Sequence, residues 1–155
     1  MNYVISGLPL APFKKHFDLD SAALLLRGIE RRVADSKPGY PCRISLQDAE
    51  VGESLLLLNY LHHDVAGPYR ASGPIFVREA ALATARVRNA IPEQQRNRLL
   101  SVRAYDQQGG MRNAEVIGGV GLKALICHYF TDQHTAYLHV HNAKQGCFAC
   151  RVDRG

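Results

Sequence analysis

Apolar and polar positions alternate regularly in the second half of the chain, as they do in half-buried β-strands. Residues 100–105 alternate in this way, residues 107–110 form a Gln-Gln-Gly-Gly segment, and residues 111–117 follow it. This arrangement predicts a β-hairpin. The same alternation in residues 135–141 and 147–152 predicts a final pair of strands.

Apolar residues repeat at helical spacing in two places. After Asp18 or Asp20, either of which can cap a helix, they recur every four positions as far as the breaker-rich residues 35–39. The more regular repeat lies in residues 121–131, where apolar side chains fall at i, i+3, i+4, i+7 and i+8. Both stretches are expected to be helices with one buried face.

The region between these helices predicts short strands joined by turns. Residues 42–46 alternate, residues 54–60 form a nearly continuous apolar run, and the glycine-containing residues 48–53 lie between them. These features predict a hairpin whose second strand is covered on both faces. Residues 62–73, rich in glycine and proline, predict a loop.

Four further segments complete the predicted order of elements. Residues 3–8 and 75–77 predict strands, residues 79–88 predict a helix, and Pro92 suits the first turn of another short helix. Hairpins interrupted by helices, without regular strand-helix alternation, indicate an α+β fold. We expect a single globular domain over residues 1–155, with a mainly antiparallel β-sheet and two principal helices packed on it.

Charge is unevenly distributed along the chain, whose formal net charge is +5. Six arginines against two glutamates lie in residues 78–103, which predicts a basic face. Such a face suits an acidic partner, but no aromatic residue lies between Phe76 and Tyr105 to stack on a base. Nucleic acid is therefore not the expected partner.

The four cysteines and the first residues of the chain bear on location. The N-terminus lacks the basic-then-apolar layout of a signal peptide, and no aliphatic run approaches the ~20 residues that a membrane span needs. We therefore expect free thiols, a cytoplasmic location and no membrane partner.

The predicted strand at residues 135–141 carries the most informative side chains. Because side chains alternate along a strand, Leu138 and Val140 should face the core while His139 and His141 face the opposite side. If residues 142–146 form the connecting loop, Cys147 lies across from His141, Ala149 from His139 and Arg151 from Tyr137.

Two chemistries suit this polar face. His-x-His on a strand can supply two ligands to zinc or another transition metal, and Cys147 can supply a third, so His139, His141 and Cys147 form a candidate metal site. The same histidines can instead hydrogen-bond a ligand or a polar network. No carboxylate completes the metal set.

Two stiff turns add cationic and aromatic candidates. Residues 38–43 deliver Arg43 into a strand, and residues 68–74 carry Tyr69 beside Arg70. Arginine beside an aromatic residue suits a carboxylate or phosphate ligand, and equally a cation-π contact that holds a loop. The candidate ligand-binding residues are therefore Arg43, Tyr69, Arg70, His139, His141, Cys147 and Arg151.

Four stretches together resemble the bacterial domain-of-unknown-function 1203 family. They are Gly39-Tyr40-Pro41-Cys42-Arg43, the strand from Gly52-Glu53 to Tyr60, Tyr69-Arg70 with Gly73-Pro74-Ile75-Phe76-Val77-Arg78, and His141-Asn142-Ala143 with Gly146-Cys147 and Arg151-Val152-Asp153-Arg154. The resemblance implies one full-length domain and no assigned activity. Alanine is usual in the family where this chain has Cys150, which speaks against a zinc site that uses both Cys147 and Cys150.

Three functions follow from these features. The leading one is binding, with or without transformation, of an anionic small molecule in an arginine- and histidine-lined pocket. The alternatives are a metal-dependent enzyme centred on His139 and His141, and a non-catalytic interaction module that uses the basic face. The catalytic residues, the ligand and the oligomeric state cannot be assigned from the sequence.

Overall fold

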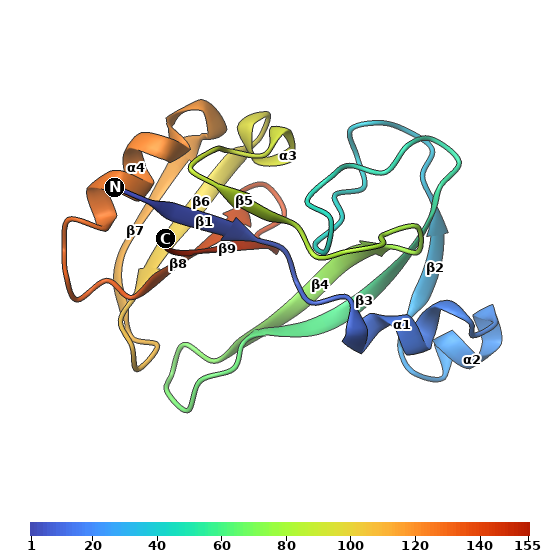
Figure 1. Cartoon of the computed structure of the whole chain (residues 1–155). Helices are drawn as coiled ribbons and strands as arrows, with labels where there is room; N and C mark the ends of the chain where they lie inside the picture. Colours follow the sequence, from blue (N-terminus) through green and yellow to red (C-terminus); the bar gives the residue numbers. More distant parts are fainter.

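The computed structural model describes residues 1–155 and contains two antiparallel β-sheets (Figure 1). Six strands form the larger sheet in the order β5-β1-β9-β8-β6-β7, and three form the smaller sheet in the order β2-β3-β4. In chain order the strands are Tyr3–Ser6 (β1), Glu30–Val33 (β2), Ser54–His63 (β3), Ala71–Arg78 (β4), Arg86–Arg88 (β5), Leu99–Tyr105 (β6), Met111–Gly118 (β7), Tyr137–Asn142 (β8) and Phe148–Arg154 (β9).

Short helices connect the strands. They are Ala11–Phe17 (α1), Ser21–Leu25 (α2), Glu93–Arg96 (α3) and Leu122–Tyr129 (α4), and a 3-10 turn at Gly119–Gly121 precedes α4. The predicted helix in residues 121–131, the short helix after Pro92 and the hairpin formed by β6 and β7 are confirmed. The antiparallel, sheet-rich α+β architecture is also confirmed, with two sheets in place of the one expected.

One core lies between α4 and the larger sheet. Leu122 and Ile126 of α4 are fully buried against Val102 of β6 and against Leu138 and Val140 of β8. Leu138 and Val140 therefore face the core, as their alternation predicts. Figure 1 shows α4 on the side of the larger sheet that faces away from β3 and β4.

A second core lies around the smaller sheet. Phe13 of α1 and Leu24 of α2 pack with Leu56 of β3 and Ile75 of β4, and Phe148 of β9 belongs to the same cluster. Cys150, two residues further along β9, belongs instead to the core beneath α4, because the pairing of β9 with β8 shifts by one residue between Phe148 and Cys150. The opposite face of the larger sheet is therefore turned toward the smaller sheet.

The long helix predicted after Asp20 is wrong beyond its first turns. Asp20 does cap α2, because its carboxylate accepts a 2.8 Å hydrogen bond from the Ala23 amide. The helix ends at Leu25, and the turn after it contains Gly28, whose φ of +70° favours glycine; the Ile29 amide donates to the Leu24 carbonyl at 3.0 Å. The chain then turns into β2, so the four-residue repeat extends across a helix and a strand.

The hairpin predicted from residues 42–46 and 54–60 is also wrong. Residues 42–46 form a turn with a positive φ at Leu46 and only an isolated bridge from Cys42 to Phe76, although Cys42, Ile44 and Leu46 are all buried. The β3 strand pairs with β2 and β4 instead. The alternation of apolar residues in 42–46 therefore reflects their burial in a turn and not a β-strand.

Three further boundaries differ from those predicted. Residues 79–88 do not form a helix, because their last three residues are β5, paired with β1. The α1 helix was not predicted, and Pro12 lies in its first turn rather than closing a strand. The loop expected at residues 62–73 is shorter, because β3 continues to His63 and β4 begins at Ala71.

Candidate functional site

Aromatic and basic side chains gather between the two sheets, on the face of the larger sheet opposite α4. The antiparallel register pairs Arg103 of β6 with His139 of β8, and Tyr105 with Tyr137, so these four side chains share one face. Phe148 lies across from His141 on β9, and β3 contributes two adjacent histidines. We call this set the inter-sheet cluster: His62, His63, Arg103, Tyr105, Tyr137, His139, His141 and Phe148.

His139 lies at the centre of the inter-sheet cluster. Its ring centroid is 5.0 Å from that of His63, 5.0 Å from that of Phe148 and 5.3 Å from that of Tyr105. Phe148 also stacks on His62 at 5.2 Å. The two sheets are thus joined through ring packing around a histidine that is 2% exposed.

Both ring nitrogens of His63 have protein partners. Nδ1 lies 2.7 Å from the Tyr69 carbonyl oxygen, which can only accept, so Nδ1 carries the hydrogen. In the neutral ring Nε2 then accepts from the Tyr137 hydroxyl, also at 2.7 Å. His63 therefore connects the β3–β4 loop to β8 and has no free polar atom for a ligand.

The other three histidines each present a buried ring nitrogen without a protein partner. These atoms are Nδ1 of His62, Nδ1 of His139 and Nε2 of His141. His141 donates from Nδ1 to the Gly146 carbonyl at 3.0 Å, so its free nitrogen is the one that carries the lone pair. Buried polar atoms are nearly always hydrogen-bonded in proteins, so three such atoms in one cluster indicate a site for a further group.

Burial keeps these three histidines uncharged at neutral pH. It is the largest cause that lowers the pKa of His62 to about 4, of His141 to about 3 and of His139 to about 2. Neighbouring charge acts in the same direction, from Arg103 on His62 and His141 and from His63 on His139.

Arg103 is the cationic group of the inter-sheet cluster. Its side chain is half-buried and belongs to none of the salt bridges of the chain; it donates from Nε to Ser101 Oγ at 3.4 Å and also hydrogen-bonds the Tyr105 side chain. The guanidinium also influences the pKa values of His62, His141 and Tyr105, so it lies close to all three. The cluster therefore combines a positive charge without a counter-charge and three neutral imidazoles.

Three of the predicted ligand-binding residues lie at or beside this cluster. His139 and His141 are inside it, and Arg151 is across from His139 with its guanidinium 3.9 Å from the Tyr137 ring centroid. Arg151 also pairs with Asp153, so its charge is balanced. A fourth predicted residue, Tyr69, borders the cluster: its carbonyl accepts from His63, and its ring, in a residue that is 41% exposed, lies 6.2 Å from that of Tyr105.

The remaining predicted residues do not converge on the cluster. Arg70 is exposed and pairs with Asp64. Arg43 is 1% exposed. It donates hydrogen bonds to the Phe148 carbonyl at 2.7 Å, to the Pro41 carbonyl at 2.5 Å and to Cys147 Sγ at 2.9 Å. Arg43 and Cys147 therefore hold the β8–β9 turn to the 38–43 turn.

The predicted cross-strand register is wrong. His141 lies across from Phe148 rather than Cys147, and a further shift of one residue between Val140 and His141 places His139 across from Arg151 rather than Ala149. The proposed metal set of His139, His141 and Cys147 does not form: no group of three or more His, Cys, Asp or Glu side chains is arranged to hold a metal ion.

Of the eight residues of the inter-sheet cluster, only His139 and His141 are among the candidate ligand-binding residues that the sequence predicts. His62 and His63 were assigned to a loop, yet they continue the apolar run of β3 beyond Tyr60. Arg103 and Tyr105 were placed correctly on the polar face of a strand, but only the final register brings that face beside His139. The alternation in residues 100–105 was therefore the available signal.

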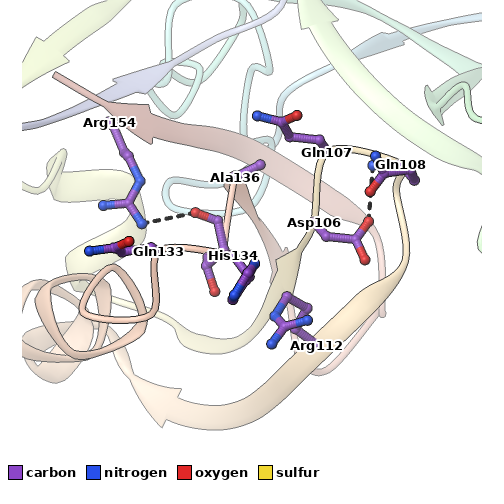
Figure 2. A pocket seen from close by; sticks show the side chains of 9 residues that line it. Asp106, Gln107, Gln108, Arg112, Gln133, His134, Ala136 and Arg154 are labelled. Carbon is purple, nitrogen blue, oxygen red and sulfur yellow. Dashed lines mark hydrogen bonds between the residues drawn. The ribbon is translucent and has the colours of Figure 1, made fainter.

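Two cavities lie away from the inter-sheet cluster, because none of its residues lines them. Figure 2 shows one of about 630 Å³ with Asp106, Arg112, His134 and Arg154 around it. Arg154 donates to the carbonyls of Phe130, Asp132 and Thr135, each at 2.9 Å, and Arg112 pairs with Asp132. These arginines are thus already engaged by the protein.

A second cavity, of about 500 Å³, is lined by both charges. Lys37 and Glu50 form a salt bridge on its wall, and Arg78, which also lines it, pairs with Glu53. Both cations that line it are therefore paired with carboxylates of the protein.

The six arginines in residues 78–103 do not form one continuous basic face. Arg78 pairs with Glu53, Arg98 pairs with Asp48, and Arg103 belongs to the inter-sheet cluster. Only Arg86, Arg88 and Arg96 are exposed. The charge excess of the sequence is therefore dispersed over the structure.

Fold and site together define a two-sheet α+β protein whose polar centre is a histidine and tyrosine cluster between the sheets. The chain belongs to the family described as protein of unknown function (DUF1203), whose model matches residues 39–154. No curated protein and no solved structure matches the chain. None of its helices has the length and apolar character needed to cross a membrane.

The stretches that carry the family resemblance contact one another in the structure. Arg43, from the first stretch, bonds Cys147 in the last, and Glu53, from the second, pairs with Arg78 in the third. The Tyr40 and Phe76 rings lie 5.2 Å apart. Much of the family pattern thus describes a network that joins the turns and the two sheets.

Proposed function

We propose that this protein binds a small anionic molecule at the inter-sheet cluster. Arg103 holds the anionic group, and ring nitrogens of His62, His139 and His141 provide further polar contacts. The observation that carries the proposal is a half-buried guanidinium without a carboxylate partner beside three buried, unpartnered ring nitrogens.

Electrostatics favours an anion over a neutral or cationic ligand here. Charge-assisted hydrogen bonds from arginine to carboxylate or phosphate are about twice as strong as neutral ones. The pKa values of His62 and His141 are lowered partly by Arg103, so an anion beside the guanidinium offsets that influence. The anion therefore stabilises both the arginine charge and any proton that the histidines take up.

A binding titration with paired variants tests the proposal. Acetate, inorganic phosphate and methylphosphonate are titrated at pH 7 into wild-type protein, Arg103→Met and Arg86→Met, with binding measured calorimetrically. Arg86 is an exposed arginine on β5 and serves as the matched control. We expect at least roughly tenfold weaker binding in Arg103→Met alone, which corresponds to one charge-assisted hydrogen bond. Equal binding by both variants, or none by the wild type, contradicts the proposal.

A cytoplasmic location is part of the same proposal. All four cysteines are free, and Cys42 and Cys150 are buried in separate cores. Unpaired thiols suit a reducing compartment. Thiol counting on denatured, unreduced protein from cells should find four reactive groups, and a protected pair contradicts this expectation.

A further inference from the structure

We infer that the ligand of the inter-sheet cluster carries a hydroxyl group close to its anionic group, and that His141 Nε2 accepts a hydrogen bond from that hydroxyl. The inference rests on the proposed function, because it takes the anion on Arg103 as given. It names the ligand class as small hydroxy-carboxylates and hydroxyalkyl phosphonates or phosphates.

The hydrogen bond to Gly146 determines which nitrogen of His141 is available. A carbonyl oxygen has no hydrogen to donate, so Nδ1 of His141 must be the donor across the 3.0 Å contact. A neutral imidazole carries one ring hydrogen, so Nε2 has a lone pair and no hydrogen. Anything that binds Nε2 must therefore bring its own donor.

No protein group fills that role. Nε2 of His141 is buried and unpartnered, and the residue is 1% exposed. The nearest ring is that of His62, at 5.1 Å between centroids and steeply inclined to His141. Arg103 donates a hydrogen bond to Ser101 and none to His141. A hydrogen-bond acceptor without a partner thus lies on the same face of the larger sheet as Arg103.

The depressed basicity of His141 suits acceptance of a hydrogen bond without proton uptake. Its pKa is lowered to about 3, mainly by burial and further by Arg103, His62 and Arg43. The ring therefore remains a neutral acceptor through the physiological range. A hydroxyl satisfies this acceptor, whereas a carboxylate oxygen without a proton does not.

Strand register limits the size of the ligand. Ser101 pairs with His141 and Arg103 pairs with His139, so Arg103 and His141 are diagonal neighbours on β6 and β8. Diagonal neighbours on adjacent strands lie about 7–8 Å apart, which long side chains can bridge. A ligand of a few heavy atoms can therefore contact both residues, with its hydroxyl one or two bonds from the anionic group.

Matched ligand pairs measure the contribution of the hydroxyl. Glycolate is compared with acetate, and hydroxymethylphosphonate with methylphosphonate, by calorimetry at pH 7. In wild-type protein the hydroxylated member of each pair should bind roughly fivefold to tenfold more tightly, the value of one buried hydrogen bond.

Two substitutions at His141 separate its two nitrogens. His141→Asn keeps a donor near the Nδ1 position for the Gly146 carbonyl and removes the acceptor, so in this variant glycolate should bind no more tightly than acetate, and hydroxymethylphosphonate no more tightly than methylphosphonate. His141→Gln places an amide oxygen near the Nε2 position and should retain part of the preference. Circular dichroism confirms that both variants are folded.

The outcomes distinguish this inference from the function on which it rests. If acetate and methylphosphonate bind through Arg103 but the hydroxyl adds nothing, the inference is wrong and the anion site stands. A preference that survives in His141→Asn also overturns the inference. If no anion binds, both fall.

Discussion

Two arginines of this protein, Arg43 and Arg103, differ in how far the protein itself uses their hydrogen-bond donors. Arg43 is almost fully buried and donates to two carbonyls and a thiol sulfur, so its bonding capacity serves the fold. Arg103 is half-buried, pairs with no carboxylate and lies beside histidines whose ring nitrogens lack partners. The comparison teaches that residue type alone does not identify a site. A site is identified by polar atoms that lack hydrogen-bond partners and are held in place by packing.

The largest expected difference between the two arginines is in stability. Arg43→Met removes the donor for two buried carbonyls and for the half-buried sulfur of Cys147. A buried acceptor left unpaired costs about 1–3 kcal/mol, so the loss should be on the order of 4 kcal/mol. Arg103→Met should cost less than about 1 kcal/mol, because no salt bridge is broken. Urea denaturation of both variants measures the difference. Similar losses would show that Arg103 is also structural.

Acid should destabilise the protein through the inter-sheet cluster. The folded pKa values of His139 and His141, about 2 and about 3, lie below the ordinary value of 6.5. Between these values the unfolded chain binds protons that the folded chain excludes, so stability present above pH 6.5 is lost as the pH falls. At pH 5 the loss should be on the order of 2 kcal/mol for each histidine.

Denaturation midpoints between pH 7.5 and pH 5 check this dependence. A His139→Phe/His141→Phe double variant should show a shallower decline, and His134→Gln, which alters an exposed histidine, should follow the wild type. A wild-type stability that does not change over this range would mean that these imidazoles are not held neutral by burial.

The smallest expected effect distinguishes two histidines within the cluster. His63→Phe leaves the Tyr137 hydroxyl and the Tyr69 carbonyl without a partner and should cost about 2 kcal/mol. His139→Phe keeps the ring packing and removes a buried unpartnered nitrogen, so it should be neutral or stabilising by up to about 1 kcal/mol while it weakens anion binding. Thermal denaturation and the acetate titration report both effects. A reversed order of stabilities would contradict the assigned hydrogen bonds.

Local periodicity predicted those helices and strands whose form depends only on the spacing of their own apolar residues. The β6–β7 hairpin and α4 follow from spacing alone, and so does the division of β8 into Leu138 and Val140 on one side and His139 and His141 on the other. Even in α4 the prediction is coarse, because Leu125 lies only partly buried at the edge of the core.

The elements that failed depend on tertiary structure. The apolar residues at 42–46 are buried by a turn rather than by a strand. The repeat after Asp20 does not mark one buried helix face, because Leu25 of α2 and Val33 of β2 are exposed and only Ile29, between the two elements, is buried. A bulge after Val140 changed which residues face the histidines. The candidate site could be predicted only on β8, because His62 comes from a strand in the other sheet.

The measurement that tests the anion site most directly is an NMR titration of the histidine ring nitrogens. With ¹⁵N-labelled protein at pH 7, added methylphosphonate should shift the ring signals of His62, His139 and His141, while His134, which lies outside the cluster, should remain unchanged. The shifts should disappear in Arg103→Met. If these signals do not move in the wild type, or move equally in Arg103→Met, the inter-sheet cluster is not an anion site and its histidines serve the packing of the two sheets.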